Sequence, residues 1–280
     1  MDTPLNHVLF PVSFMELFAA WNRFPNAVPY AGGTNLIGRH GKNITPVFLC
    51  LEKIEELHRI TRTEHYLEIG AMTKLNRLVG LGKIVPEVLR CCIENIAGVQ
   101  LRNIATIGGN ICTTSRILDL PAPLIALDAQ YELVSMGKQK NPQTARWVSA
   151  ARFHTADEKT CLDKQELVAR IRLPLHQWDY AVYKKFYCED YYNSESLVFL
   201  AKIQKNILSE IRVVFKGSMI LRNKNGEDIL NGKILPLNRK TADDFIENWK
   251  EFLVHKQELS EFTRNSLLNS IEENVYNLSE

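Results

Sequence analysis

The sequence has no long hydrophobic run. No segment reaches the roughly 18 consecutive apolar residues that a membrane-spanning helix requires. The N-terminal segment carries an acid at Asp2 and no basic region, and Pro11, Ser13 and Glu16 interrupt its apolar stretch. This pattern is unlike a secretory signal peptide. We therefore expect a cytoplasmic protein without a membrane span.

An excess of charge of one sign is also absent. The chain has 34 lysines and arginines against 32 aspartates and glutamates, which gives a net charge of +2. The basic residues are interspersed with acids and form no stripe of the kind that binds nucleic-acid phosphates. We therefore expect no nucleic-acid partner. A composition of 45% hydrophobic and 24% charged residues is typical of a folded globular protein.

Closely spaced cysteine pairs of the metal-binding kind are missing. The six cysteines are Cys50, Cys91, Cys92, Cys112, Cys161 and Cys188, and no two have C-x-x-C spacing. Iron–sulfur clusters and structural zinc sites are typically held by cysteines at such spacings. We therefore expect reduced and mostly buried thiols, no metal bound by this chain, and no disulfide framework.

The standard nucleotide-binding fingerprints are absent as well. Gly33 and Gly38 have the spacing of a P-loop, but Arg39-His40 follows where that motif requires Lys and then Ser or Thr. No G-x-G-x-x-G occurs, since Gly80-Leu81-Gly82 is followed by Val85 at the place of the third glycine. These departures exclude a P-loop enzyme and a Rossmann dinucleotide site of the usual kind.

Short strands and helices alternate in the first part of the chain. Ser13 and Glu16 have the spacing of a capping box, which predicts a helix that begins there. Pro86 predicts the first turn of another helix. The remaining patterns predict strands at 28–31, 47–51, 59–61, 66–69 and 167–173, a hairpin of 131–136 with 146–148 around 137–141, and a helix over 121–127.

The pattern changes after Pro174-Leu175-His176. Strands are expected at 181–187, 197–203 and 211–219, followed by helices from Thr241 and from about Ser260. A chain of 280 residues is longer than an ordinary single domain. We therefore place a domain boundary near residue 176 and expect an α+β protein with two unequal domains.

Two glycine pairs carry the strongest functional signal. They lie in Ala31-Gly32-Gly33-Thr34-Asn35-Leu36 and in Ala105-Thr106-Ile107-Gly108-Gly109-Asn110-Ile111. Paired glycines can adopt positive φ, so that successive backbone N–H groups converge on an anion such as a pyrophosphate. The alternative is that each pair is a tight turn, but two such segments with flanking polar residues in one α/β region favour a phosphate site.

These segments resemble the flavoprotein subunits of molybdenum hydroxylases, a family that includes xanthine dehydrogenases and aerobic carbon monoxide dehydrogenases. The likeness extends to Arg102-Asn103-Ile104 before the second pair and to the segment Asp119-Leu120-Pro121-Ala122-Pro123 after it. The resemblance implies an FAD-binding domain of the vanillyl-alcohol-oxidase (PCMH) type over residues 1–176, with two α/β subdomains. It also implies a smaller α+β C-terminal domain over residues 177–280.

The resemblance also implies the cofactor contacts. The first segment, Ala31, Gly32, Gly33, Thr34, Asn35 and Leu36, would surround the FAD pyrophosphate, and Thr106, Gly108, Gly109 and Asn110 would form the opposing wall. Asp119 would reach the sugar or the adenine end, and Leu173 and Lys185 would lie near the flavin ring. Taken by themselves, Asp119 is typical of a helix cap, Leu173 of a buried strand and Lys185 of a surface.

Two segments depart from the family pattern. Residues 113–119 lack the usual small or polar run that ends in Ala-Gly-Asp or Ala-Ser-Asp. Residues 184–193 carry Glu189 and Asp190 where relatives usually have arginines. Negative charge near a flavin disfavours its anionic reduced form, so this change is expected to alter the flavin potential or the acceptor. Tyr191 and Tyr192 have two interpretations, packing on the flavin or filling the domain interface, and the second is favoured.

The resemblance finally implies a division of labour. A molybdopterin-binding large subunit would oxidise the substrate, a ferredoxin-like subunit would relay electrons through [2Fe–2S] clusters, and this chain would pass them through FAD to NAD or another acceptor. No catalytic acid or base is expected here. Two alternatives remain: a stand-alone flavin reductase of the UDP-N-acetylenolpyruvoylglucosamine reductase kind, and a scaffold subunit that has lost FAD.

Overall fold

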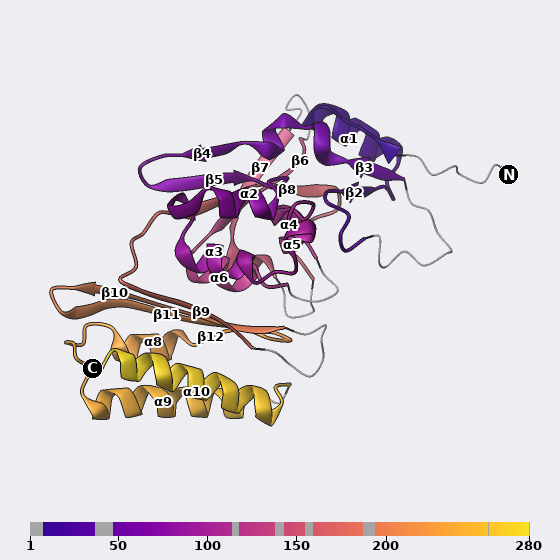
Figure 1. The fold of residues 1–280 in the computed structure, drawn as a ribbon. Coiled ribbons are helices and arrows are strands. Elements are labelled where there is room, and N and C mark those ends of the chain that lie inside the picture. The colour runs from indigo at the N-terminus through magenta and orange to yellow at the C-terminus, as the bar shows by residue number, and fades with distance from the viewer. Residues whose placement is uncertain are drawn as a thin grey trace. The chain divides into compact units, whose positions relative to one another are not determined.

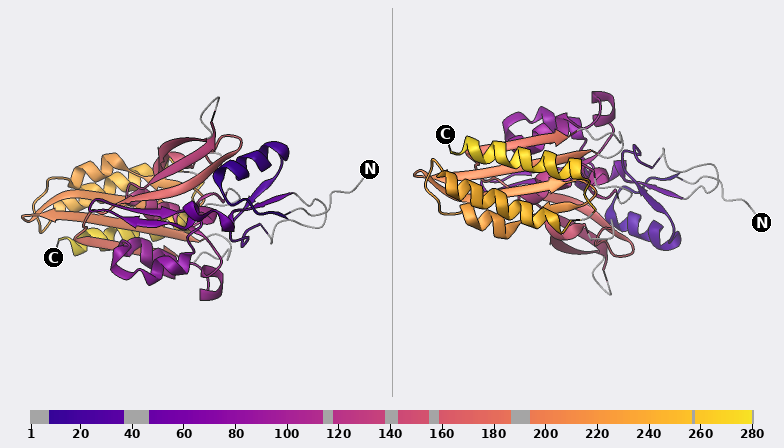
Figure 2. Two further views of the ribbon diagram at one scale, coloured as in Figure 1. Left: turned by 90° about the horizontal axis from the view of Figure 1, so that it is seen from above. Right: turned by 90° about the horizontal axis from the view of Figure 1, so that it is seen from below.

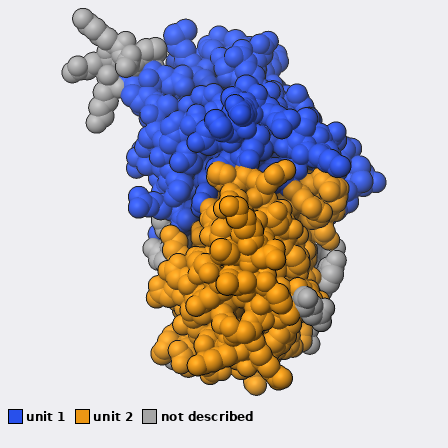
Figure 3. All heavy atoms as spheres, turned by 90° about the vertical axis from the view of Figure 1, so that its left-hand side faces the viewer, with its two compact units in different colours: residues 1–86, 96–115, 128–175 blue, residues 87–95, 116–127, 176–280 orange. Residues whose placement is uncertain are grey.

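The computed structural model describes residues 8–36, 47–113, 118–137, 143–154, 159–186, 194–256 and 258–279. Its residues form two compact units, coloured blue and orange in Figure 3, which are not continuous in sequence. Unit 1 contains residues 1–86, 96–115 and 128–175, and unit 2 contains residues 87–95, 116–127 and 176–280. The predicted domain division at 176 stays a prediction.

Unit 1 begins with a small parallel sheet and one amphipathic helix (Figure 1). The sheet order is β1 (Val8–Leu9), β3 (Phe48–Cys50), β2 (Val28–Tyr30). Helix α1 (Phe14–Arg23) begins at the predicted capping box, where the Ser13 hydroxyl accepts from the Glu16 N–H at 3.2 Å. The Glu16 carboxylate in turn accepts from the Val12 N–H at 3.0 Å. The capping prediction is therefore confirmed.

The larger sheet of unit 1 has the order β4 (Ile60–Arg62), β5 (Tyr66–Gly70), β8 (Glu166–Pro174), β6 (Gln130–Met136), β7 (Gln143–Ser149). All its neighbouring strands are antiparallel. One face is apolar, since its side chains include Leu67, Ile69 and Ile171, each 0% exposed. The other face carries an ion-pair network, in which Arg170 binds Glu132 at 2.6 Å and Arg172 binds Glu68 at 2.6 Å.

Short helices connect the strands of unit 1. The α-helices are α2 (Leu75–Gly80), α4 (Val99–Arg102), α5 (Ile107–Ile111) and α7 (Ala150–Phe153), and the 3-10 helices are η1 (Leu51–Lys53), η2 (Glu55–His58) and η3 (Gly82–Ile84). Gly108 and Gly109 form no glycine-rich loop or tight turn, because both residues lie inside α5. Thr106, whose side-chain oxygen accepts from the Gly109 N–H, caps this helix.

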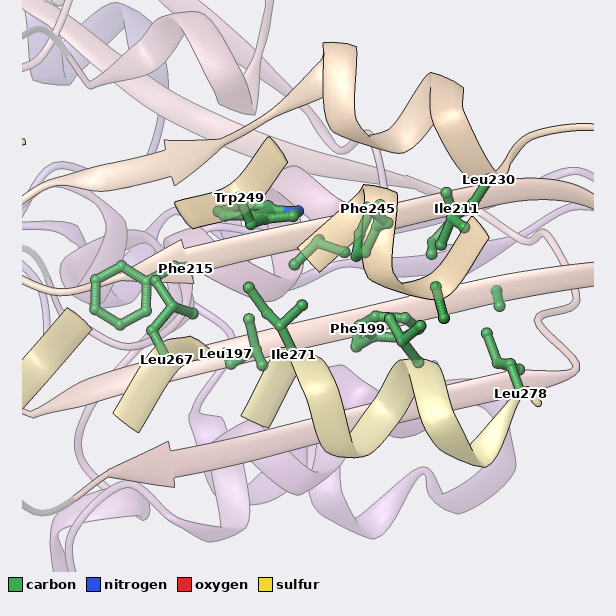
Figure 4. Packing of buried hydrophobic residues seen from close by; sticks show 14 of the residues in the cluster. Leu197, Phe199, Ile211, Phe215, Leu230, Phe245, Trp249, Leu267, Ile271 and Leu278 are labelled. Carbon is green, nitrogen blue, oxygen red and sulfur yellow. The ribbon is translucent and has the colours of Figure 1, made fainter. Parts of the chain in front are cut away.

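Unit 2 is built on an antiparallel sheet of order β12 (Ile220–Arg222), β11 (Ile207–Lys216), β10 (Glu195–Gln204), β9 (Tyr180–Phe186). Helices α8 (Lys224–Leu230), α9 (Arg239–Val254) and α10 (Glu261–Asn277) cover one face of it (Figure 2). Figure 4 shows the core between them, in which Phe199, Phe215 and Trp249 are each 0% exposed. Burying one such ring stabilises the fold by about 1.5–3 kcal/mol.

The opposite face of this sheet packs against α3 (Glu87–Glu94) and α6 (Pro121–Ala126). Arg212 of β11 reaches across and donates to the Ala126 carbonyl at 2.7 Å. Unit 2 therefore includes α3 and α6, which lie far before β9 in the sequence. The mixed α and β composition and the predicted strands and helices of this part are confirmed, whereas β12 and α8 were not predicted. No helix in the described part of the chain is long and apolar enough to cross a membrane.

Candidate functional site

The first glycine segment follows β2 and needs both of its glycines. Gly33 has φ +68°, and a Cβ on it would lie 2.2 Å from the Tyr30 hydroxyl oxygen. A Cβ on Gly32 would lie 2.3 Å from the Ile104 carbonyl oxygen. Real Cβ atoms do not approach other atoms so closely. Left-handed backbone at one glycine and close packing at the other therefore determine the path of this segment.

The first segment also has backbone donors to spare. Within the described residues, the N–H groups of Gly32, Gly33 and Thr34 donate to no carbonyl or side chain. Thr34 is exposed, and Asn35 and Leu36 are half-buried. Unused backbone donors that follow one another along a glycine turn suit an anionic ligand. The anion-binding nest over residues 31–36 stays a prediction.

The second glycine segment has a different local role. The N–H groups of Ile107 and Gly108 donate to the carbonyls of Thr73 and Ala71 at 3.0 and 2.9 Å. The Gly109 N–H donates to the Thr106 hydroxyl at 3.0 Å. These donors are already satisfied within the chain, so the expected nest of backbone N–H groups does not form here. Gly108 instead allows close packing, because a Cβ on it would lie 2.8 Å from the Ala71 carbonyl oxygen.

The fold brings the two glycine segments of unit 1 together. Gly32 packs on the Ile104 carbonyl, and a Cβ on Gly109 would lie 3.8 Å from the Ala31 Cβ. Asn110, on α5, is 8% exposed. Its side-chain oxygen is buried and has no hydrogen-bond partner. A buried amide oxygen without a donor is costly, so a ligand that supplied a donor at this position would stabilise the site.

Asp119 lies in unit 2, where its carboxylate has three polar neighbours. Lys185 Nζ donates to Oδ2 at 2.9 Å, and the Ser194 hydroxyl donates to Oδ1 at 2.5 Å. Lys216 Nζ lies 3.7 Å from Oδ1. Burial raises the Asp119 pKa, but Lys216 and Lys185 outweigh it, so the pKa lies below its ordinary value. Asp119 is therefore an ionised, buried acceptor.

Neither of the ordinary interpretations of Asp119 and Lys185 holds. The N-cap of α6 is Leu120, and no side chain caps that helix. The Lys185 side chain is only 14% exposed and also donates to the Asn95 carbonyl at 3.0 Å. The structure thus brings together two residues for which the sequence predicted separate contacts, as members of one buried ion pair.

Sequence reasoning missed three further residues of this cluster, Ser194, Lys216 and Cys92. Lys216 on β11 is 3% exposed, and Cys92 on α3 is 0% exposed. Burial raises the pKa of the Cys92 thiol, and the Asp119 charge raises it further. Lys216 had a usable signal, because it directly follows the apolar run Val213-Val214-Phe215 of a predicted strand. That position alone did not reveal its partner, which lies far away in the sequence.

The remaining predicted positions show no polar chemistry or fall outside the described residues. Leu173 of β8 is 0% exposed and pairs with Leu67 across the sheet. Residues 114–117 and 187–193, which include Glu189, Asp190, Tyr191 and Tyr192, are not among the described residues. A cavity of about 580 Å³ lies in unit 1 beside β1 and α1, and no predicted site residue lines it.

Comparison with known proteins finds a family of FAD-binding domains and several dehydrogenases similar to this chain. A family model described as "FAD binding domain in molybdopterin dehydrogenase" matches residues 4–176. Xanthine dehydrogenase 2 of Arabidopsis thaliana is 29% identical over 245 residues, which cover 80% of this chain and 18% of the plant protein. The xanthine dehydrogenase FAD-binding subunit of Escherichia coli O157:H7 is 30% identical over 155 residues, 54% of this chain and 51% of that subunit.

Solved structures share the fold at lower sequence identity. A quinoline 2-oxidoreductase structure from Pseudomonas putida 86 has a TM-score of 0.78 at 20% identity, and the match covers 100% of this chain and 98% of that one. Because the family model spans more than half of the sequence, the chain belongs to the family of FAD-binding domains of molybdopterin dehydrogenases, and its cofactor is FAD.

Proposed function

We propose that this chain is the FAD-binding subunit of a molybdenum hydroxylase of the xanthine dehydrogenase type. In this proposal it takes electrons from [2Fe–2S] clusters of a ferredoxin-like partner, while a molybdopterin-binding large subunit oxidises the substrate. The final acceptor is NAD or another electron acceptor. The family match over residues 4–176 supports the proposal, as does the matching FAD-binding subunit of a bacterial xanthine dehydrogenase.

The fold within this proposal follows the family plan. Residues 1–176 form a PCMH-type FAD-binding domain with two α/β subdomains, and residues 177–280 form the smaller C-terminal domain. The fold-level match to a quinoline 2-oxidoreductase chain over its whole length is the support for this division. Helices α3 and α6 belong to unit 2 by their contacts, although they lie within residues 1–176. This is compatible with the division, because the domains are defined by family relationship and the compact units by contacts.

The observation that carries the FAD assignment is the open set of backbone donors in the first glycine segment. The N–H groups of Gly32, Gly33 and Thr34 have no acceptor within the described residues, and a pyrophosphate offers oxygens bearing two negative charges. In this proposal residues 31–36 bind the diphosphate, and Thr106, Gly108, Gly109 and Asn110 form the wall that faces it. Asn110 holds a buried amide oxygen without a donor, which a hydroxyl of the cofactor would satisfy and the diphosphate, which has only acceptors, would not.

The predicted contacts in the second group, Asp119, Lys185 and Leu173, are made by side chains and not by backbone N–H groups. Asp119 is an ionised carboxylate with Lys185 on one oxygen and Ser194 on the other. A carboxylate accepts about four hydrogen bonds, so it retains room for a hydroxyl of the cofactor's sugar portion. Lys185 and Leu173 complete the proposed contacts. Each acts by orienting the cofactor, and none needs to exchange a proton during turnover.

When bound, FAD accepts electrons from a cluster and delivers a pair of them to the acceptor. The chain itself binds and orients the cofactor. Within the described residues, no group of three or more His, Cys, Asp or Glu side chains could hold a metal ion. The clusters and the molybdenum centre are therefore assigned to partner subunits.

The proposal is tested by purification and reconstitution. The chain should co-purify from native extract with an iron–sulfur subunit and a molybdopterin subunit. The assembled complex should couple substrate oxidation to acceptor reduction, and removal of FAD should abolish that coupling. Turnover with the physiological acceptor that continues after FAD removal would overturn the proposal. A folded chain that takes up no flavin would instead support the scaffold alternative.

A further inference from the structure

Lys216 is a second buried lysine close to the Asp119–Lys185 pair. Lys216 ends β11, where the strand register places it directly opposite Ser196 of β10. Its side chain is 3% exposed. Burying an ammonium group costs several kcal/mol unless hydrogen bonds and opposite charge compensate for the lost water. A lysine in this position therefore requires specific acceptors around its ammonium group.

The acceptors of Lys216 connect it to Asp119. Its ammonium group donates to the Ser194 backbone carbonyl, and at 3.3 Å to the Ser194 hydroxyl. The same hydroxyl donates to Asp119 Oδ1 at 2.5 Å. Lys216 is also 3.7 Å from that oxygen. Lys216 thus affects Asp119 in two ways. It orients the Ser194 hydroxyl, and its own positive charge attracts the carboxylate.

The two oxygens of Asp119 are held by different residues. Lys185 occupies one position on Oδ2, at 2.9 Å, and Ser194 with Lys216 occupies Oδ1. This arrangement prevents rotation of the carboxylate and leaves acceptor capacity for one further donor. Lys185 has a second acceptor in the Asn95 carbonyl at 3.0 Å, so it is anchored independently of Lys216.

We propose that Lys216 is a positioning residue of the cofactor site, which holds Ser194 and Asp119 in the orientation in which Asp119 accepts a hydroxyl of the FAD sugar portion. This inference rests on the proposed contact between Asp119 and FAD and deepens it. Lys216 itself need not touch the cofactor. Its role is to make Asp119 a fixed acceptor that stays charged when the solution is acidified.

The charged and titratable groups that face Asp119 come from three described elements. They are Lys185 and Tyr183 on β9, Lys216 on β11 and Cys92 on α3. Burial raises the Asp119 pKa, and among the causes that lower it the Lys216 charge is the largest. Cys92 and Tyr183 remain neutral, because burial raises the pKa of both. Removal of Lys216 therefore raises the Asp119 pKa, and Asp119 gains a proton at a higher pH.

The test measures FAD affinity of the full chain as a function of pH. Apo-protein is titrated with FAD, and flavin fluorescence reports binding from neutral to mildly acidic solution. Lys216→Met keeps the length of the side chain and removes its charge. We expect about tenfold weaker binding at neutral pH, the equivalent of one charge-assisted hydrogen bond. The loss should grow on acidification, beginning at a higher pH than in the parent chain.

Two further variants separate positioning from general damage. Lys216→Arg retains the charge and should restore most of the affinity and the parent pH profile. Ser194→Ala removes the linking hydroxyl, should weaken binding in the same direction, and serves if Lys216→Met does not fold. Lys233→Met, at an exposed lysine of the same unit, is the matched control and should bind like the parent chain.

The outcomes distinguish this inference from the proposed function. If Asp119→Asn weakens binding but Lys216→Met and Ser194→Ala keep the affinity and pH profile of the parent, the positioning role of Lys216 is wrong. If the parent chain binds no FAD, or Asp119→Asn binds as the parent does, the proposed cofactor contact of Asp119 fails first. Equal weakening at every pH, not rescued by Lys216→Arg, would show a purely structural lysine and overturn the inference.

Discussion

The Lys185 ammonium group donates to the Asp119 carboxylate at 2.9 Å, and both side chains are largely buried, at 14% and 10% exposure. The two residues are far apart in the sequence, one before α6 and the other on β9. A buried ion pair is a weak source of net stability but a strong constraint on geometry. We therefore regard this pair as a device that fixes the direction of two polar groups within unit 2.

The purified chain should be yellow and should release FAD rather than FMN on denaturation. The reason is that the N–H groups of Gly32, Gly33 and Thr34, which have no acceptor among the residues that the structure describes, suit a diphosphate, which FMN lacks. Flavin identity is measured by chromatography of the released chromophore. Release of FMN, or failure to take up any flavin on reconstitution, would contradict the diphosphate assignment.

Gly33→Asp should abolish FAD uptake while the chain stays folded. It places a carboxylate beside the proposed diphosphate and a Cβ only 2.2 Å from the Tyr30 hydroxyl oxygen, at a φ of +68°. FAD occupancy and circular dichroism are measured together. Gly82→Ala is the control, since Gly82 has φ +57° with open space around its Cβ position. It should cost about 1 kcal/mol of stability and leave FAD occupancy unchanged.

If Gly33→Ala loses FAD as completely as Gly33→Asp, steric exclusion is sufficient and the added charge is irrelevant. Retention of full occupancy in Gly33→Asp would remove residues 31–36 from the cofactor site. The comparison with Gly82→Ala separates the strain of positive φ, common to both positions, from the effect on the ligand.

Asp119→Asn should lower the free energy of unfolding by about 3 kcal/mol at neutral pH, because it leaves buried ammonium groups without their counter-charge. The Asp119 pKa is lowered on folding from its ordinary value of 3.8. Its contribution is therefore complete above that value and is lost as pH falls through the folded pKa. Denaturant unfolding at several pH values should show the difference between parent and variant shrinking in acid.

A stability difference that is independent of pH, or one that grows in acid, would show that the ion pair does not titrate as described. The apo-proteins should be compared, because bound FAD would add its own stabilisation to the parent chain.

The isolated chain should hydroxylate no purine, aldehyde or related heterocycle, yet it should transfer electrons slowly from NADH to a dye through its flavin. This follows from the assignment of the metal centres to partner subunits. Activity assays on the isolated and co-expressed chains, together with their sizes in solution, provide the measurement. Hydroxylation by the isolated, metal-free chain would contradict the division of labour.

Local patterns in the sequence predicted most elements correctly. The spacing of Ser13 and Glu16 placed the start of α1, and the proline at 86 placed the start of α3. Such signals are local, since a capping oxygen binds a donor three residues away. The hairpin of β6 and β7 was also predicted from a local pattern, two strand-like runs on either side of residues 137–141.

The same local reasoning failed for the second glycine pair. Gly108 and Gly109 look like a turn in the sequence, but their N–H groups are used by Ala71 and Thr106 and the segment is helical. The deciding contact is the close approach of Ala71, which is distant in the sequence and invisible to any local pattern. Propensity is a weak prior that tertiary packing overrides.

The sequence by itself determined the alternation of elements, the two glycine segments and, through them, the family and the cofactor. These features depend on residues that are neighbours along the chain. The tertiary structure alone decided that, of the two glycine segments, the first keeps N–H donors with no acceptor among the described residues. It also decided that Asp119, Lys185, Ser194 and Lys216 form one largely buried cluster. The physical reason is that burial and pairing of charges depend on which distant strands and helices pack together, and no local spacing specifies that packing.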